Sequence, residues 1–398
     1  MRAIRAGCVL TPLTSFAPGT VLIQGEKIVA VGPTDQIRIP EDAAVIDVAD
    51  KVVGPGFIDT HVHGRDGSYF GEDLESTTQL CHSIVSSGVT SLLPTLATLL
   101  PIQYTLDMIL DRIRVVREAM IRDKGGAEIL GIHMEGPYLS GAETARGSQV
   151  VANLRRPAVE ELHRMVDVAG GAIRKMSIAP ELDGALDVIR ELARLGIVAC
   201  AAHSTASYEQ TMQAVQAGLQ CATHVFNGMV PLHHRQPGLL GAALTCDEIN
   251  AELIADGQHV SPVAMKILLR CKGVDGVHLV SDNTRWAGMP NGTYQDGERT
   301  IVKEEQRAYV VGGTLAGSVA SMGHCVSTLV HTVSCSLGQA IQMASLNPAR
   351  VIGVDQRKGS LEPGKDADVV VLDKELKVEM TMVRGQIVYH AEQGGCCA

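Results

Sequence analysis

The chain is poor in aromatic side chains and in positive charge. Of its 398 residues, 3% are Phe, Trp or Tyr, so the core must be packed mainly with aliphatic side chains and Met. The net charge is −10, and no run of Lys or Arg is longer than two residues. Both features argue against nucleic acid or an anionic membrane surface as the main partner. An anionic small molecule is not excluded, because a few well-placed cations are enough to bind it.

The sequence also lacks segments that would direct or anchor it in a membrane. No run of about 18 apolar residues is present, so no transmembrane helix is expected. The first residues, Met1 to Cys8, contain no apolar stretch of the kind found in signal peptides. The ten cysteines are scattered and lie mostly inside apolar runs, which favours reduced thiols over a disulfide framework. We therefore expect a cytoplasmic protein without a membrane partner.

Both ends of the chain read as short strands. Hydrophobic residues make up 45% of the sequence, which indicates a globular protein with a sizeable core. Residues 21–31 hold two apolar runs around a Gly-containing turn, and residues 380–389 repeat this pattern, so each segment predicts a β-hairpin. We expect residues 1–54 and 359–398 to form one small β-sandwich domain, with residues 55–358 inserted between them.

The inserted segment alternates short apolar runs with helical patterns. The runs that predict strands are 56–63, 89–95, 129–135, 175–179, 198–203, 221–226, 251–256 and 277–282. Helices are expected between most of them, at 74–87, 102–119, 158–169, 184–195, 207–217 and 261–270. Such repeated alternation, with strands apolar on both faces, predicts a TIM-like (β/α)8 barrel. A doubly wound open sheet is the alternative, but no G-x-G-x-x-G motif follows the first strand.

Polar side chains gather at the carboxyl ends of the predicted strands. His61 and His63 end the first run, and their spacing puts both side chains on one face of a strand. Later runs end in His133 and Glu135, His203, His224, Asp256 and Asp282. Taken singly, a His or Asp in such a place more often caps a turn or the next helix. In a (β/α)8 barrel, however, these ends converge on the face where active sites lie.

This convergence predicts a metal site. Imidazole and carboxylate suit Zn²⁺, Fe²⁺, Mn²⁺, Co²⁺ or Ni²⁺, and the set is large enough for one or two divalent ions. We expect the two histidines of the first run to serve one ion, those of the fifth and sixth runs to serve the other, and Glu135 to bridge them. Asp282 could either ligate or act as general base on a metal-activated water, whose pKa falls to roughly 7. The expected reaction is hydrolysis of an amide or a related C–N bond.

Seven short motifs follow one another along the chain. The first is PGFIDTHVH at 55–63, and the others are HMEGP at 133–137, THVFNGM at 223–229, DGQHV at 256–260, LVSD at 279–282, GTLAGS at 313–318 and NPAR at 347–350. The first motif resembles the opening strand of the amidohydrolase superfamily. The ordered set resembles, within it, the family of N-acetylglucosamine-6-phosphate deacetylases.

The resemblance implies roles for the residues at the strand ends. The main metal ion would be held by Glu135, His203 and His224. The His61–His63 pair would hold a second ion, as in those members that use two. Asp282 would be the catalytic acid and base. The activity implied is removal of the acetyl group from N-acetyl-D-glucosamine 6-phosphate, which gives D-glucosamine 6-phosphate and acetate.

The resemblance also implies how the phosphorylated amino sugar is bound. The substrate-binding positions would be Asn227, Gly228, Arg235, His259, Leu315 and Gln149. Among these, Arg235 would meet the phosphate across the interface of a homodimer. Four places depart from the family pattern: Arg65 lies in a loop that usually carries a glycine cluster, Gln149 stands where a histidine is expected, and Gly228 and Asn283 each replace a common alanine. None of these belongs to the metal or acid–base set, so they bear on which sugar is bound and on its phosphate rather than on the hydrolysis.

Two other functions remain open at this point. One is a deacetylase of another N-acylated amino sugar, such as N-acetylgalactosamine 6-phosphate. The other is a catalytically silent barrel that serves as a binding protein. The complete set of strand-end histidines and carboxylates argues against the silent barrel.

Overall fold

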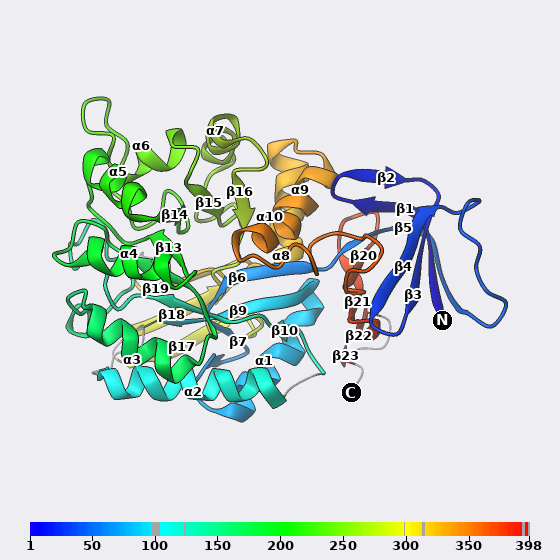
Figure 1. The fold of residues 1–398 in the computed structure, drawn as a ribbon, viewed down its shortest axis with the longest axis horizontal. Helices are drawn as coiled ribbons and strands as arrows, with labels where there is room; N and C mark the ends of the chain where they lie inside the picture. Colours follow the sequence, from blue (N-terminus) through cyan, green and yellow to red (C-terminus); the bar gives the residue numbers. More distant parts are fainter. Residues whose placement is uncertain (98–103, 123–124, 298, 313–314, 392–394, 397–398) are drawn as a thin grey trace.

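The computed structural model of the chain consists of a barrel with a sheet unit beside it (Figure 1). It describes residues 1–97, 104–122, 125–297, 299–312, 315–391 and 395–396. The first and last strands lie in the sheet unit, and the segment between them forms the barrel. None of the helices in these described ranges is both long and apolar enough to cross a bilayer.

The barrel is built from parallel strands, as the sequence predicts. Their bounds are β6 Phe57–Val62, β9 Val89–Ala97, β11 Ile132–Glu135, β12 Ile173–Ile178, β13 Val198–Ala201, β14 Leu219–Ala222, β15 Asn250–Leu253 and β16 Val277–Leu279. Each pairs in parallel with the next. The ring is completed after β16, where the N–H of Asp282 donates to the carbonyl of His61 at 2.8 Å. This closure rules out the open sheet.

The polar residues that end the predicted runs lie just beyond several of these strands. β13 ends at Ala201, β14 at Ala222 and β16 at Leu279, each before the polar residue of its run. The strands themselves are apolar because they lie between the barrel interior and the helices; β6 and β9 are buried at every position. His203, His224 and Asp282 therefore lie where the chain leaves the strand and turns.

Helices surround the barrel (Figure 1). Their bounds are α1 Leu74–Ile84, α2 Leu106–Arg122, α3 Val159–Ala169, α4 Ala185–Arg194, α5 Tyr208–Ala217, α6 Gly238–Thr245, α7 Pro262–Lys272, α8 Met322–Thr328, α9 Leu337–Ala344 and α10 Leu346–Val351. The six predicted helices correspond to α1 to α5 and α7. The predicted start of α2 at 102–103 lies outside the described residues. Local signals fix the ends: Ser207 caps α5 by accepting from Gln210 N, and Gly218 ends it at φ +115°.

The sheet unit joins the two ends of the chain. Its strands are β1 Arg2–Thr11, β2 Thr14–Phe16, β3 Gly19–Gln24, β4 Lys27–Pro33, β5 Ala44–Pro55, β20 Val369–Leu372, β21 Val378–Val383, β22 Gln386–His390 and β23 Gly395–Cys396. The predicted hairpins are β3–β4 and β21–β22. Because β5 pairs with both β1 and β20, the strands form one continuous sheet rather than two separate ones. Buried side chains from both halves, such as Val21 and Met382, share one apolar cluster.

The sequence prediction contains no strands between residues 283 and 312, but the chain forms a small antiparallel sheet there. Its strands are β17 Gly292–Asp296, β18 Arg299–Glu304 and β19 Arg307–Val310. Two further short strands, β7 Gly64–Arg65 and β8 Ser68–Tyr69, pair directly after β6. Both insertions follow barrel strands at their carboxyl ends, so they add walls to that face of the barrel.

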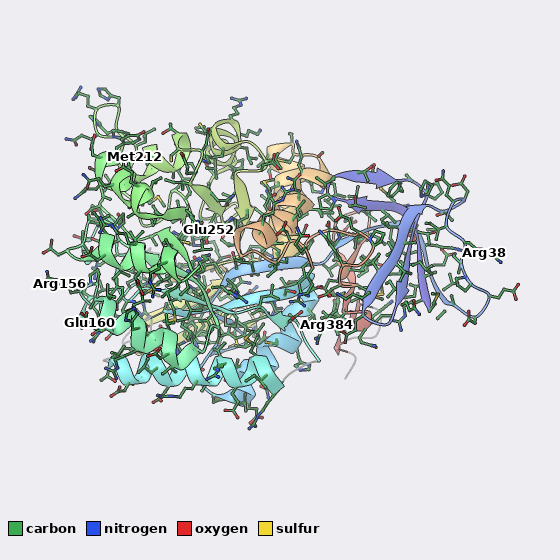
Figure 2. The ribbon with its side chains drawn as sticks, in the orientation of Figure 1. Arg38, Arg156, Glu160, Met212, Glu252 and Arg384 are labelled. Atoms are coloured by element: carbon green, nitrogen blue, oxygen red, sulfur yellow. The ribbon has the colours of Figure 1, made fainter. Side chains whose placement is uncertain are left out.

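Charged side chains are distributed unevenly between surface and interior. Figure 2 labels Arg38 at the far end of the sheet unit and Arg156 and Glu160 at the edge of the barrel, and all three are exposed. Glu252, on β15, lies instead inside the barrel with no exposed surface. A buried carboxylate in this position requires partners, because an isolated buried charge is very costly.

Candidate active site

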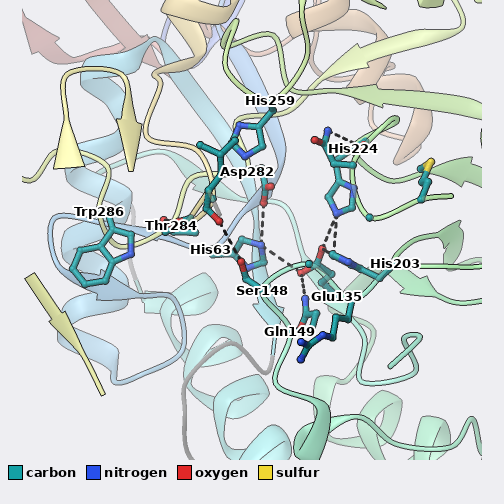
Figure 3. Close-up of a pocket in the computed structure, with 18 of the residues that line it drawn as sticks. His63, Glu135, Ser148, Gln149, His203, His224, His259, Asp282, Thr284 and Trp286 are labelled. Atoms are coloured by element: carbon teal, nitrogen blue, oxygen red, sulfur yellow. Dashed lines mark hydrogen bonds and ion pairs between the residues drawn. The ribbon is translucent and has the colours of Figure 1, made fainter. Parts of the chain in front are cut away.

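The carboxyl ends of the barrel strands open into a pocket of about 590 Å³. The predicted strand-end groups that line it are His63, Glu135, His203, His224 and Asp282. Figure 3 shows these side chains directed toward a common centre, with the ion pairs between them drawn as dashed lines. His61 is fully buried and contacts Glu135 and Asp282 through its Nε2. The structure thus brings together all six residues predicted for metal binding and acid–base chemistry.

Three of these residues have an unusual backbone conformation. His203, His224 and Asp282 have φ values of +43°, +33° and +49°. Non-glycine residues with positive φ carry of order 1–3 kcal/mol of strain each, and such residues concentrate at functional sites. Each lies two or three residues beyond the end of a barrel strand, at the turn from which its side chain enters the pocket.

Glu135 lies between two pairs of histidines. Its Oε1 is 3.2 Å from Nε2 of His224 and 3.3 Å from Nε2 of His203. The same Oε1 is 3.5 Å from Nε2 of His61, and Oε2 is 3.6 Å from Nε2 of His63. Burial alone would raise the pKa of Glu135, but the surrounding imidazoles hold this pKa well below its usual range. The bridging position expected for Glu135 is therefore available to an ionised carboxylate.

The donor atoms fit one or two divalent metal ions. In each pair the ring nitrogens face each other at 3.2 Å, Nε2 of His61 toward Nε2 of His63 and Nε2 of His203 toward Nε2 of His224. At most one proton fits between two such nitrogens, whereas a shared cation satisfies both lone pairs. Two sets of ligand atoms, each containing Glu135 and one histidine pair, are close enough to hold an ion. Imidazole and carboxylate are common ligands of zinc and related metals.

A third group with ligand-type side chains lies deeper in the barrel. Cys200, Cys221 and Glu252 are all fully buried, and their ligand atoms are within 4.8 Å of one another. Glu252, however, already forms an ion pair with Lys175. A metal ion there would meet the ammonium group, so this cluster does not extend the metal site.

His203 is held in one orientation by its surroundings. Its Nδ1 donates to the carbonyl of Ala145 at 2.8 Å, which leaves Nε2 free to ligate. Gly228 has φ +61°, and a Cβ built there would lie 2.7 Å from Nδ1 of His203. Glycine at position 228 therefore has a structural reason, because a side chain there would collide with the ring of His203.

Asp282 faces the His61–His63 pair from the opposite wall. Its Oδ1 is 3.1 Å from Nε2 of His63 and 3.3 Å from Nε2 of His61, and its side chain is 14% exposed toward the pocket. Burial raises the pKa of Asp282, but the charges of His61 and His63 outweigh it and lower the pKa to about 2. Asp282 is thus an ionised group that can meet both the metal centre and a ligand in the pocket.

Most of the predicted substrate residues lie on the pocket wall. These are Asn227, Gly228, His259, Leu315 and Gln149. Gln149 is buried, and its Nε2 donates to Oε2 of Glu135 at 3.0 Å. His259 pairs through Nδ1 with Oδ2 of Asp256 at 2.6 Å, and although burial lowers the pKa of His259, this carboxylate raises it above its usual value. Arg235 is different, since it lies on an exposed loop outside the described lining of the pocket.

The sequence prediction missed several residues of the pocket. Trp286 and Arg299 come from the segment around the β17–β19 sheet, and Arg299 pairs with Asp296. Arg146 also lines the pocket and has no ion-pair partner among the described residues. Arg146 lies only three positions before Gln149, so its place in the same loop was the one available signal. Nothing in the sequence pattern connects the β17–β18 hairpin with the pocket.

Fold and site together define a barrel hydrolase with a histidine–carboxylate centre at the carboxyl ends of its strands. The chain belongs to the amidohydrolase family, whose profile matches residues 52–388. Membership of this family supports an enzyme rather than the catalytically silent binding protein considered above.

Within this family, the chain is similar to deacetylases of phosphorylated amino sugars from a mammal and from bacteria. The N-acetylglucosamine-6-phosphate deacetylase of Bos taurus is 37% identical over 362 residues, which cover 87% of this chain and 86% of the relative. The N-acetylgalactosamine-6-phosphate deacetylase of Escherichia coli O157:H7 is 36% identical over 354 residues, covering 87% and 90%. Among solved structures, an aspartate-to-alanine mutant of the N-acetyl-D-glucosamine-6-phosphate deacetylase of Mycobacterium smegmatis, in complex with N-acetyl-D-glucosamine-6-phosphate, matches with a TM-score of 0.88 and 32% identity, covering 97% and 98%.

Proposed function

We propose that this chain hydrolyses the N-acetyl group of N-acetyl-D-glucosamine 6-phosphate to give D-glucosamine 6-phosphate and acetate, using one or two divalent metal ions. The observation that carries the proposal is the position of Glu135 within reach of four imidazoles, with Asp282 facing the same centre. The deacetylases that are 36–37% identical to the chain support the substrate class.

The proposed chemistry divides between the metal centre and the residues of the pocket. When bound, a divalent ion supplies Lewis acidity, which activates a water and polarises the acetyl carbonyl. Asp282 accepts a proton from the attacking water and then donates it to the amine nitrogen, so that a C–O bond forms as the C–N bond breaks. Gln149 holds Oε2 of Glu135, and His259, paired with Asp256, offers its remaining ring nitrogen to the sugar.

The proposed phosphate site combines neutral donors with an arginine. Asn227 lies on the pocket wall and is followed by Gly228, whose backbone approaches the pocket closely because it has no side chain. Arg146 adds a cation from the same chain. Arg235 is exposed, so we propose that it reaches the phosphate in a second copy of the chain within a homodimer. Guanidinium and backbone N–H groups are well matched to phosphate oxygens.

The galactosamine isomer is a second candidate substrate, because the N-acetylgalactosamine-6-phosphate deacetylase of Escherichia coli O157:H7 is 36% identical to the chain and the N-acetylglucosamine-6-phosphate deacetylase of Bos taurus is 37% identical. The test is acetate release from the two N-acetylhexosamine 6-phosphates and from the two unphosphorylated sugars, with the metal-loaded protein. We expect kcat/KM to be highest for N-acetyl-D-glucosamine 6-phosphate. A higher value for the galactosamine isomer would favour the second candidate, and no acetate from any of the four would refute both.

His61→Ala should lower the metal content of the protein by one ion per chain. The imidazole contributes one of three donors to its set, and a divalent ion with only two protein ligands binds weakly. The measurement is the metal-to-protein ratio by atomic emission after dialysis at a fixed free zinc concentration. His133→Ala is the matched control, since this buried ring lies beside His61 but bonds Thr95 and Ser177 instead of facing the centre. An unchanged ratio in His61→Ala would mean that a second ion is not held there.

Arg235→Ala should raise KM for the phosphorylated substrate about 10-fold or more and leave KM for the unphosphorylated sugar unchanged. The reason is that a hydrogen bond to a charged group contributes about 1.5–3 kcal/mol. Mixing Arg235→Ala chains with inactive Asp282→Asn chains tests the shared site. If Arg235 acts in the partner subunit, each mixed dimer regains one complete site and the low KM returns. If no low-KM activity appears in the mixture, Arg235 does not act across an interface.

A further inference from the structure

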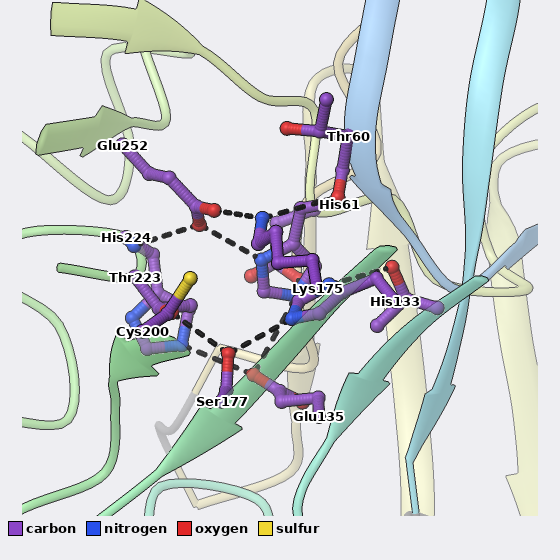
Figure 4. A network of polar contacts seen from close by, with 12 residues as sticks. Thr60, His61, His133, Glu135, Lys175, Ser177, Cys200, Thr223, His224 and Glu252 are labelled. Carbon is purple, nitrogen blue, oxygen red and sulfur yellow. Dashed lines mark hydrogen bonds and ion pairs between the residues drawn. The ribbon is translucent and has the colours of Figure 1, made fainter. Parts of the chain in front are cut away.

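A buried ion pair lies beneath the metal centre, in the interior of the barrel. Lys175 on β12 and Glu252 on β15 have no exposed side-chain surface, and Oε1 of Glu252 accepts from Nζ of Lys175. Figure 4 shows both side chains within a network that reaches His61, His224 and Thr60. Stability alone does not account for such a pair, because replacing a buried ion pair by apolar residues of similar volume is often neutral or stabilising.

The second oxygen of Glu252 contacts one member of each histidine pair. Oε2 is 3.1 Å from Nδ1 of His61, and it accepts the backbone N–H of His224 at 3.2 Å. Lys175 adds a link to the same region, since its Nζ donates to the carbonyl of Thr60 at 3.2 Å, the residue before His61. The pair therefore ties β12 and β15 to both halves of the metal centre.

The geometry determines which nitrogen of His61 carries the proton. A carboxylate can only accept hydrogen bonds, so the Nδ1 that faces Glu252 carries a proton, and in the neutral imidazole that ligates a metal ion this is the only proton on the ring. The lone pair is then on Nε2, the atom that faces His63, Glu135 and Asp282. Lys175 keeps the carboxylate in place, because an ammonium group offers only donors and binds the other oxygen.

We propose that the Lys175–Glu252 pair is a positioning device for the metal centre, which fixes the ring tautomer of His61 and the backbone of His224. Glu252 acts through these residues and does not reach the pocket, of whose described lining it forms no part. The inference rests on the proposed ligation of an ion by His61. Losing a group that orients a metal-ligating histidine typically weakens metal binding 10- to 100-fold.

Glu252 can be tested with a pair of double variants that differ in one group. K175M/E252Q and K175M/E252M both remove the two buried charges, so neither leaves an unpaired ammonium in the barrel. The glutamine can turn its carbonyl oxygen toward Nδ1 of His61 and the N–H of His224, because no ammonium competes for it. The methionine has a similar shape but no acceptor of comparable strength. Circular dichroism and thermal unfolding establish that both variants are folded.

The readout is the zinc affinity of each protein, measured without substrate by competition with a chromophoric chelator. We expect K175M/E252Q to bind zinc within about 3-fold of the unaltered chain and K175M/E252M to bind one ion 10- to 100-fold more weakly. Equal affinities in the two variants would overturn the inference, and so would His61→Ala binding zinc as tightly as the unaltered chain. Because no substrate is present, a failure of the unaltered chain to release acetate would refute the proposed activity without changing this comparison.

Discussion

Asp282→Asn is expected to lower acetate release by at least about 10³-fold while the protein keeps its metal. General acid–base catalysis by a positioned side chain contributes typically 10²–10⁴-fold, and here one group serves both proton transfers. Asparagine has nearly the same shape, and the backbone of residue 282 keeps its bonds to His61 and Ser318. The variant should therefore fold normally but offer no basic oxygen to the attacking water. Steady-state rates and metal content on the same samples measure both quantities.

The metal content decides how a loss of activity is interpreted. Oδ1 of Asp282 is within 3.3 Å of Nε2 in both His61 and His63, so a role as a metal ligand is geometrically open. If Asp282→Asn loses metal in proportion to activity, Asp282 is mainly a ligand. If metal is retained and the rate is unchanged, another group carries out the proton transfers. Asp256→Asn makes a useful contrast, since it removes a carboxylate from the end of the neighbouring strand β15 and should act mainly on KM through His259.

The barrel could be predicted because its strands are apolar on both faces and end in polar residues. This pattern is local, and a run such as that of β9, buried at all positions, is visible without knowledge of its neighbours. The β17–β19 sheet could not be predicted in the same way. Only a few of its positions, such as Ile301 and Ala308, are buried, so the alternation that marks a strand is weak. The continuous sheet at the chain ends depends on the pairing of β5 with β20, a contact between distant segments.

The part of the site that could be predicted consists of the residues at the ends of the predicted strands. Each histidine of the centre lies at the end of a predicted run, with His61 and His63 sharing the first, and the barrel topology brings these ends together. The partner of Glu252 could not be foreseen, because Lys175 lies 77 residues earlier, at the start of another predicted strand. The orientation of His203 likewise depends on Ala145 and Gly228, two residues that have no functional group in the side chain. The histidines and carboxylates of the centre were visible in the sequence, whereas the residues that hold them in place were not.

Glu135→Gln is expected to remove the metal from both sets of ligands at once. Glu135 is the one residue shared by the two groups of ligand-type atoms at the pocket. The glutamine side chain lacks the negative charge of the carboxylate, and its NH₂ group replaces one of the two acceptor oxygens that face the imidazoles. Metal content should fall below about one tenth of an ion per chain, and acetate release by at least about 10³-fold, because a metal contributes several kcal/mol to such a reaction. A second readout is independent of activity: zinc should raise the Tm of the unaltered chain but not that of the variant.

The matched control is Glu161→Gln, the same change at a carboxylate on α3 that pairs with Arg155 and takes no part in lining the described pocket. This control should keep both metal and activity, although its local ion pair is lost. If Glu135→Gln keeps one ion per chain and loses the other, then one histidine pair binds its ion without the bridge. Substituting each pair in turn in the Glu135→Gln background would then identify it. If both ions remain, Glu135 does not bridge, and the convergence of four imidazoles on its carboxylate would require a different explanation.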